Sequence, residues 1–342
     1  MKILFLSHKF YPDIGGIEVN SEILATAFSE AGNEVHLATW TEKDGEKNFA
    51  FEVIRKPSRR RLIKEHLWAD LIYENNPCLR LSWPSLFIPT PGVVALRTWI
   101  SRMDGTIGLQ DRLKFGWLTR AKAVIAVSQA VKTRSWPSAT VIGNPYRKDV
   151  FKIIPGVNRN KTFVFLGRLV SDKGADIAIK ALDELSTEHE NSQFSLTIIG
   201  DGPERKKLEK LVKESCLEEK VTFCGSLGGQ ELVEALNAHK YIIVPSKWEE
   251  PFGNVVLEGM ACGCIPIVSD GGGLPDAVGN AGLLFRRGDV KSLVAQIEKI
   301  SGSATLEESL RNAAIKHLAA HTPELISGKY LQVLQQASTV TK

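Results

Sequence analysis

The sequence predicts an α/β protein with two Rossmann-like domains that face each other across a cleft. Three observations support this fold class: short apolar runs alternate with helical segments, the alternation restarts after a polar joint, and glycine-containing loops follow several of the runs. Buried parallel strands have this near-continuous apolar character, because helices cover both faces of their sheet. A chain of 342 residues is long enough for two domains of ordinary size.

The first domain is predicted over residues 1–152. Its first run, Met1–His8, is too short for the apolar core of a signal peptide and is expected to form a buried strand. Turn residues over Tyr11–Gly16 precede a helical pattern at Val19–Ala31, which ends at Gly32. The strands predicted for this domain are Lys2–Ser7, Glu34–Thr39, Leu71–Tyr73, Val93–Leu96 and Ala123–Val127.

A polar segment, Ile153–Lys161, contains Pro, Gly and two Asn residues and is typical of a linker. The second domain is predicted over residues 160–321, with strands at Thr162–Leu166, Ser195–Ile199, Lys220–Phe223, Tyr241–Val244 and Ile265–Val268. A last helix is predicted at Pro323–Ala337. Its apolar face is expected to consist of Leu325, Ile326, Tyr330, Leu331 and Leu334.

The charge of the chain is distributed unevenly. Up to residue 150 there are 21 Lys and Arg against 15 Asp and Glu, whereas the remainder has 22 against 24, which gives the formal net charge of +4. A basic excess confined to one half indicates an anionic surface or substrate on that side. No apolar run approaches the roughly 20 residues of a membrane span, and no nucleic-acid partner is expected.

Five cysteines, an odd number with irregular spacing, do not form a disulfide framework. Cys262 and Cys264 have the spacing of half a metal site, but the sequence offers no second pair or His cluster near them. We therefore interpret them as small buried residues and expect the protein to be cytoplasmic.

Two carboxylates, Glu250 and Glu258, flank a Pro-Phe-Gly turn that leads into an apolar run. Because Pro disfavours helix in the residue before it, the helix should begin near Gly253 or Asn254, with Glu258 just over one turn inside. The N–H groups and positive dipole end of such a helix start form an anion site. The two carboxylates could do no more than complement the dipole, but Glu258 lies among apolar residues, where a charge needs a partner or an aqueous cleft.

Gly167, Arg168 and Lys173 follow the first predicted strand of the second domain. Arginine forks onto phosphate oxygens and lysine supplies a compact charge, so the two cations would suit a leaving diphosphate. They could also be solvated charges around a turn, but loops at the carboxyl ends of parallel strands are where such sheets bind ligands.

Three further loops contain glycine. Ile14–Glu18 would let backbone N–H groups approach a ligand, and Ser269–Pro275 could shape a sugar pocket. In Gly200–Pro203, Gly202 either contacts a ligand or only makes the turn. The G-x-G-x-x-G fingerprint expected of a nicotinamide enzyme is absent from the first strand-end loop, and no Walker loop occurs.

The segment Arg59–Trp68 mixes four cations with Leu62, Ile63, Leu67 and Trp68. This composition could lie on an anionic membrane surface, although a solvated helix face is the preferred interpretation. In the first case the segment has a lipid partner, and in the second it has none.

Together these residues resemble the retaining glycosyltransferases of family 4, which have the glycosyltransferase-B fold. The resemblance covers nearly the whole chain and is specific in combination. It rests on the E-x7-E motif from Glu250 to Glu258 and on the segments Gly167–Gly174, Gly15–Glu18, Ala126–Ala130 and Val141–Tyr146.

The resemblance implies that the C-terminal domain binds a nucleotide-sugar, that the N-terminal domain binds the acceptor, and that the segment 323–342 crosses back onto the N-terminal domain. By resemblance, Arg168 and Lys173 hold the diphosphate, Glu258 bonds the ribose hydroxyls and Glu250 lies against the donor sugar. The catalytic residues implied are Arg168, Lys173 and Glu250. The donor site implied consists of Gly16, Gly167, Arg168, Lys173, Phe252, Gly253, Asn254, Val255 and Glu258, with Gly202, Val221, Phe223 and Cys224 near the base.

Family members of this kind act without a metal ion, which agrees with the absence of a D-x-D triplet, so no cofactor is expected. One departure concerns Arg97, which follows the predicted strand Val93–Leu96 where many relatives carry a His near the donor sugar. Arg97 either replaces that contact or points elsewhere. Glu18 and Arg97 are the residues expected on the acceptor or sugar side.

These inferences predict a retaining transferase that moves a sugar from a nucleotide-sugar, with UDP-sugar the expected donor, to a glycan or lipid-linked acceptor in polysaccharide biosynthesis. One alternative is a sugar-nucleotide epimerase, which has the same architecture. Another is a non-catalytic subunit of a membrane glycan assembly complex, suggested by Arg97 and by Arg59–Trp68.

Overall fold

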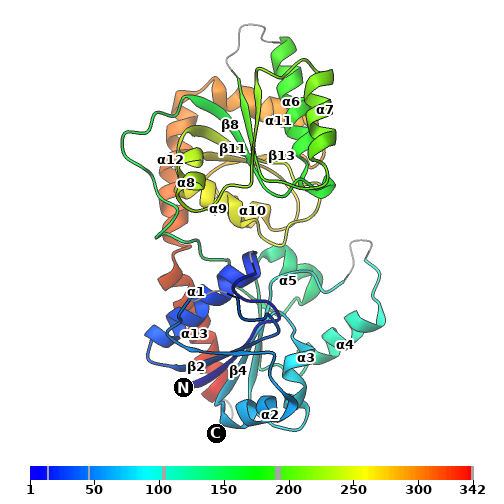
Figure 1. Cartoon of the computed structure of the whole chain (residues 1–342), viewed down its shortest axis with the longest axis vertical. Coiled ribbons are helices and arrows are strands. Elements are labelled where there is room, and N and C mark those ends of the chain that lie inside the picture. Colours follow the sequence, from blue (N-terminus) through cyan, green and yellow to red (C-terminus); the bar gives the residue numbers. More distant parts are fainter. Residues whose placement is uncertain (14, 45–46, 102–104, 189–193, 340–342) are drawn as a thin grey trace. The chain divides into compact units, whose positions relative to one another are not determined.

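The protein is described from a computed structural model, in which residues 1–13, 15–44, 47–101, 105–188 and 194–339 are placed. The chain divides into two compact units. Unit 1 consists of Met1–Pro145 and Pro323–Lys342, and unit 2 of Tyr146–Thr322. Each unit contains one parallel sheet with helices on both faces, as Figure 1 shows.

The sheet of unit 1 has seven strands in the order β3-β2-β1-β4-β5-β6-β7. The strands are β1 (Lys2–Leu6), β2 (Glu34–Thr39), β3 (Glu52–Arg55), β4 (Leu71–Asn75), β5 (Gly92–Leu96), β6 (Ala123–Ala126) and β7 (Thr140–Val141). The helices are α1 (Gly16–Glu30), α2 (Arg59–Trp68), α3 (Leu79–Ser82), η1 (Trp83–Leu86), α4 (Leu109–Leu118), α5 (Gln129–Ser135) and α13 (Pro323–Thr339). The strand order reverses at β1, as it does in nucleotide-binding sheets.

Alternate residues of the central strands of unit 1 belong to two separate cores. Phe5 and Tyr73 face α1 and α13, whereas Leu4 and Ile72 face α2 and α3. This follows from the two-residue period of a strand whose two faces are both buried.

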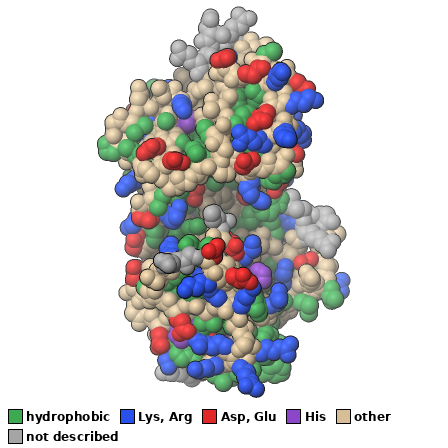
Figure 2. Space-filling view, in the orientation of Figure 1, with side chains coloured by type: hydrophobic (Ala, Val, Ile, Leu, Met, Phe, Trp, Pro, Cys, Tyr) green, Lys and Arg blue, Asp and Glu red, His purple; other side chains and the backbone are tan. Residues whose placement is uncertain are grey.

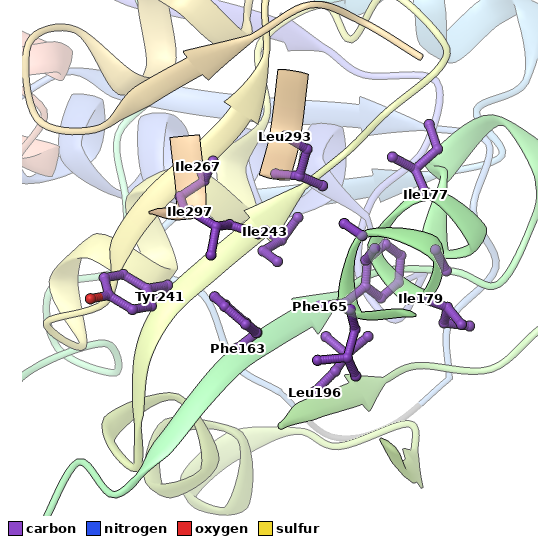
Figure 3. Packing of buried hydrophobic residues seen from close by; sticks show 14 of the residues in the cluster. Phe163, Phe165, Ile177, Ile179, Leu196, Tyr241, Ile243, Ile267, Leu293 and Ile297 are labelled. Carbon is purple, nitrogen blue, oxygen red and sulfur yellow. The ribbon is translucent and has the colours of Figure 1, made fainter. Parts of the chain in front are cut away.

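The sheet of unit 2 has six strands in the order β10-β9-β8-β11-β12-β13. The strands are β8 (Lys161–Leu166), β9 (Leu196–Ile199), β10 (Val221–Gly225), β11 (His239–Val244), β12 (Ile265–Ser269) and β13 (Leu283–Phe285). The helices are η2 (Ser171–Lys173), α6 (Ala175–Glu188), α7 (Arg205–Glu214), α8 (Gly229–Asn237), α9 (Asn254–Ala261), α10 (Leu274–Val278), α11 (Val290–Ser301) and α12 (Ala304–Ala319). Figure 3 shows Phe163, Phe165 and Ile243 of the strands packed against Ile177, Leu293 and Ile297 of the helices.

The predicted α/β class is confirmed, and every strand predicted from an apolar run overlaps an observed strand. Three strands were not predicted: β3, β7 and β13. All three are short and lie at the edges of their sheets. Residues there are partly exposed and do not form an apolar run.

The segment predicted as a linker, Ile153–Lys161, belongs to unit 2, since the boundary falls between Pro145 and Tyr146. The side chain of Asn237 holds this segment: it accepts from the N–H of Ile154 (2.8 Å) and donates to the carbonyl of Lys152 (3.0 Å). Arg159 donates to the carbonyls of His239 (3.1 Å) and Cys262 (2.6 Å). The polar composition therefore belongs to a segment that hydrogen bonds hold against unit 2, and it does not indicate a free linker.

Helix α13 packs on α1, β4 and β5 and so belongs to unit 1. Ile326, Tyr330 and Leu334 are buried as predicted, whereas the prediction for Leu325 was wrong, because that side chain is 46% exposed. Residues 340–342 of the segment predicted to cross back lie outside the described residues.

Replacing Asn237 by Ala should destabilise unit 2 by about 1–3 kcal/mol, because the part-buried backbone groups of residues 152 and 154 would lose their partner. Urea denaturation followed by circular dichroism measures this loss. Asn280→Ala, at an exposed position without a recorded partner in the described chain, is the control. Equal stability of the two variants would contradict the anchoring role.

Candidate functional site

Most predicted donor residues lie in loops at the carboxyl edge of the unit 2 sheet. Backbone hydrogen bonds join the loop after β8 to two others: the N–H of Leu169 donates to Asp201 (2.9 Å), and that of Lys247 to Asp172 (2.8 Å). The N–H of Gly273 donates to the carbonyl of Glu250 (2.7 Å). Four strand-end loops are thus held as one structure.

Helix α9 begins at Asn254, as predicted, and Gly253 is its N-cap. Gly253 has φ 106°, and a Cβ atom there would collide with the Leu274 side chain, so only glycine fits this turn. Within the described chain, the N–H groups of Phe252, Gly253 and Val255 have no acceptor. The helix start therefore offers N–H groups and the positive dipole end to a ligand.

Glu250 is buried at this turn and accepts from two side chains. One is the ammonium of Lys173, in an ion pair, and the other is the hydroxyl of Ser246 (2.8 Å). Lys173 also lies over the ring of Trp248, 5.8 Å from its centroid. Sequence reasoning assigned Lys173 and Glu250 to separate parts of a donor, and the structure brings them into direct contact.

Glu258 lies on the second turn of α9 and is only partly accessible to solvent. Burial raises the pKa of its carboxyl to about 7, against the opposing charge of Arg147. No hydrogen-bond donor contacts this carboxyl among the described residues. The geometry leaves its oxygens available to donors from a ligand, such as hydroxyl groups.

Arg168 follows β8, and its guanidinium is exposed with no acidic partner in the described part of the chain. It is therefore a cation that an incoming anion can reach without displacing a protein carboxylate. Gly167, directly before it, donates its N–H to the carbonyl of Ile199 (3.0 Å), which fixes the start of this loop against β9.

The residues predicted near a base divide into two groups. Val221 starts β10 and is buried in the core of unit 2, and Phe223 packs against the same core. Cys224 is exposed at the carboxyl end of the strand. A Cβ atom on Gly202 would collide with the backbone of Leu169, so packing alone requires that glycine.

Gly16 and Glu18 lie in the first turn of α1, directly after the loop that follows β1. Ile14 of the same predicted loop lies outside the described residues. The carboxyl of Glu18 is buried and folds back over Gly15, leaving no room for a Cβ atom there. Both residues belong to unit 1, so their predicted part in the donor site stays a prediction.

Arg97 points into unit 1 and is 6% exposed. Its guanidinium donates to Asn75 (2.6 Å), Asn144 (2.9 Å) and the hydroxyl of Tyr73 (3.0 Å), and it lies 5.1 Å from the centroid of the Tyr330 ring. Its polar groups are thus bonded within unit 1, and its predicted place on the acceptor or sugar side stays a prediction.

Sequence reasoning missed three residues of the site: Ser246, Trp248 and Arg147. Ser246 and Trp248 follow the end of β11. Their position directly after a predicted strand was the signal that could have placed them in the site. Arg147 has no such signal, because it precedes the unit 2 sheet and reaches Glu258 only through the fold.

Across the described ranges, no group of three or more His, Cys, Asp or Glu side chains is placed to hold a metal ion. None of the helices in those ranges combines the length and apolar character needed to cross a membrane.

The sequence profile of one family, Glycosyl transferases group 1, matches residues 147–317, which is half of the chain. The chain belongs to this family. The matched region includes every predicted site residue of unit 2.

Curated relatives of the group 1 family are similar to parts of the chain. The D-inositol 3-phosphate glycosyltransferase of Corynebacterium jeikeium (strain K411) is 32% identical over 170 residues, which are 48% of this chain and 39% of that protein. Its counterpart from Acidothermus cellulolyticus is 26% identical over 324 residues, 84% of this chain and 70% of that protein. The chain thus aligns with well under two thirds of the first of these relatives.

Solved structures resemble the chain over its whole length. HepE of Anabaena in complex with UDP has a TM-score of 0.80 at 22% identity and covers 98% of this chain and 100% of its own. Sucrose-phosphate synthase from Thermosynechococcus elongatus has a TM-score of 0.79 at 20% identity, with 100% of both chains covered. At these identities the comparison establishes the fold, which is that of glycosyltransferase-B structures.

Replacing Arg97 by Met should lower the stability of unit 1 by about 2–4 kcal/mol, because three buried acceptors lose a charged donor. Arg97→Lys should recover little, since an ammonium cannot match the guanidinium fork. Thermal unfolding of the two Arg97 variants measures these losses of stability, with Arg112→Met at an exposed position as the control. Unchanged stability with lost nucleotide affinity would instead favour a donor contact.

Glu258→Gln should stabilise the protein in a pH-dependent way. The folded pKa of about 7 lies above the ordinary value of 4.5, so the native state binds this proton more tightly than the unfolded chain. The destabilisation by the charged carboxyl is therefore complete above the folded pKa and fades as the pH falls toward 4.5. At about pH 8 we expect Glu258→Gln to raise the free energy of unfolding by roughly 1 kcal/mol, which corresponds to an increase of about 2–4 °C in Tm.

Melting curves recorded at about pH 8 and about pH 5 test this prediction, with Glu308→Gln on an exposed helix position as the control. The difference between Glu258→Gln and the native protein should shrink at the lower pH. A constant difference would show that desolvation of the carboxylate is not its cause.

Proposed function

We propose that the protein is a retaining glycosyltransferase of family 4 type that moves a sugar from a nucleotide-sugar, with UDP-sugar the favoured donor, to a glycan or lipid-linked acceptor in polysaccharide biosynthesis. The observation that carries the proposal is the pairing of Lys173 with Glu250 beside the start of α9. It is supported by family membership and by the exposed, unpaired cation of Arg168 on the same edge of the sheet.

In the proposed donor complex, Arg168 and Lys173 bind the diphosphate. An ammonium has three donors, so Lys173 can keep its bond to Glu250 and turn another N–H toward a phosphate oxygen. Glu250 then has two roles: it orients Lys173, and it lies beside the donor sugar. The N–H groups of Phe252, Gly253 and Val255 supply further donors.

Glu258 is proposed to bind the ribose hydroxyls of the donor. Its carboxyl lacks donors from the described residues, and burial raises its pKa. Two vicinal hydroxyls would supply the missing hydrogen bonds and favour the ionised form. The base would then lie near the exposed end of β10 at Cys224, since Val221 is committed to the core.

The proposed reaction breaks the bond between the anomeric carbon and the phosphate oxygen, and the electron pair leaves with the nucleoside diphosphate. Arg168 and Lys173 stabilise the negative charge that develops there, so their contribution is larger in the transition state than in the ground state. The acceptor oxygen attacks the anomeric carbon from the same face, and its proton passes to the departing phosphate oxygen. No metal or other cofactor enters this scheme.

A cytoplasmic location, contact of unit 1 with the acceptor, and the parts assigned to Gly16 and Glu18 remain proposals of the same kind. They rest on the sequence resemblance and on the place of these residues after the first strand of unit 1. In this scheme Arg97 supports the structure of unit 1 and does not take part in the chemistry.

Arg168→Gln and Lys173→Met should each lower kcat/KM for the donor by about 10²–10³, because each removes a cation from the developing charge. The measurement is turnover with a panel of nucleoside-diphosphate sugars, combined with the anomeric configuration of the product by NMR. Arg286→Gln is the matched control, since Arg286 is an exposed arginine of the same unit.

Three outcomes would contradict parts of the proposal. An inverted product would exclude retention, and an epimerised free nucleotide-sugar formed without acceptor would favour an epimerase. Donor binding without turnover on any acceptor would favour a non-catalytic subunit. Absence of binding to every nucleoside-diphosphate sugar would overturn the proposed function as a whole.

A further inference from the structure

Exposed apolar side chains gather on one part of unit 1. Among the described residues, thirteen large hydrophobic side chains are exposed, and seven of them fall between Ile63 and Leu113. The most exposed are Phe87 (80%), directly after η1, and Leu109 (77%), at the start of α4. Scattered exposed leucines are ordinary, but a concentration of this kind marks an interaction surface.

Helix α4 is fixed with its apolar stripe facing outward. Asp111 and Leu118 are buried on the inner side, and near the end of the helix the Trp117 indole donates to the buried carboxyl of Glu74 (2.8 Å). Leu109 and Leu113 lie one turn apart on the opposite side and are both exposed. The outward leucines thus follow from how the helix is anchored.

Helix α2 also exposes apolar side chains on its outer side. Leu62, Glu65 and His66 face the protein, while Arg61 pairs with Glu52 and Glu65. The outward side consists of Arg59, Arg60, Ile63, Lys64 and Leu67. None of its three cations has a recorded acidic partner within the described ranges.

The outward sides of α2, η1 and α4 belong to one face. All three pack on the same side of the unit 1 sheet; α2 contacts η1, and the Arg120 guanidinium donates to the carbonyl of Ser85 in η1 (2.9 Å). Figure 2 shows Lys and Arg side chains beside hydrophobic ones at the lower end of the view, where Figure 1 places α2. We call this surface the α2–α4 face.

The α2–α4 face is strongly basic. Residues 59–122 contain 11 Lys and Arg but only 5 Asp and Glu, a surplus of six that equals the whole excess of the first 150 residues. Three of the five acids, Glu65, Glu74 and Asp111, are buried, against one of the described cations, Arg97. The exposed side is thus left with cations interleaved with leucine, isoleucine and phenylalanine.

We propose that the α2–α4 face docks on a lipid bilayer that contains anionic phospholipids. Its apolar side chains would enter the boundary of the acyl region, and its cations would lie among the anionic headgroups, where each contributes about 1 kcal/mol. Charge complementarity decides between occupants: a second copy of the chain would set this basic face against an equally basic one. The inference does not depend on the proposed reaction.

The test is flotation of the full chain with vesicles of phosphatidylcholine alone and with vesicles that also contain phosphatidylglycerol. Wild-type protein should float only with the anionic vesicles, and raising NaCl from about 0.1 M to about 0.5 M should weaken binding. Leu109→Gln with Leu113→Gln, and separately Arg59→Gln, Arg60→Gln with Lys64→Gln, should each reduce binding at least about tenfold.

Matched controls come from exposed residues of unit 2: Leu284→Gln with Ile315→Gln, and Lys206→Gln, Lys291→Gln with Lys299→Gln. These should float as the wild type does, and circular dichroism should show that all variants fold. Wild-type protein that stays unbound with anionic vesicles would overturn the proposal. So would a dimer in solution that the Leu109/Leu113 variant dissolves, because the face would then bind a second copy.

Discussion

The parallel direction of all strands is the constraint on which the site depends. In a parallel sheet each strand returns by a crossover, so the loops that follow the strands meet at one edge. In unit 2 this brings Lys173, after β8, to Glu250, after β11, although they are 77 positions apart. The loops are then joined by their own backbone, as where the Gly273 N–H bonds to the carbonyl of Glu250. The ion pair thus depends on a topology that residues far from it determine.

Two buried ionisable groups differ in how far the protein satisfies them. The Arg97 guanidinium has three acceptors and an aromatic ring around it, so its polar groups are satisfied within unit 1. The Glu258 carboxyl has no donor in the described chain, and burial raises its pKa. An unsatisfied carboxyl costs stability, and such costs are typical of sites that a ligand completes. Hydrogen bonding, more than burial, therefore distinguishes the two groups.

The sequence was most informative where burial is continuous along the chain. Runs such as Phe163–Phe165 are apolar because both sides of a central strand are covered, and they predicted the strands directly. The start of α9 was predictable because Pro and Gly restrict the backbone locally. The direction of Arg97 was not predictable, because Asn144 and Tyr330 come from distant parts of the chain. The same holds for the electrostatic effect of Arg147 on Glu258, which only the fold creates.

The surface of unit 1 is a second case in which the sequence could not predict where side chains point. In α2 the sequence reveals a mixture of cations and apolar residues, but not which of them face outward. The structure decides this through inward partners: Glu65 pairs with Arg61, which leaves Arg59 and Arg60 on the outer side. The same helix buries its carboxylate, Glu65, and exposes Ile63 and Leu67, and these apolar side chains gain nothing from water. Such an arrangement fits the proposed bilayer contact, because the interface of a bilayer is apolar at one depth and anionic at another.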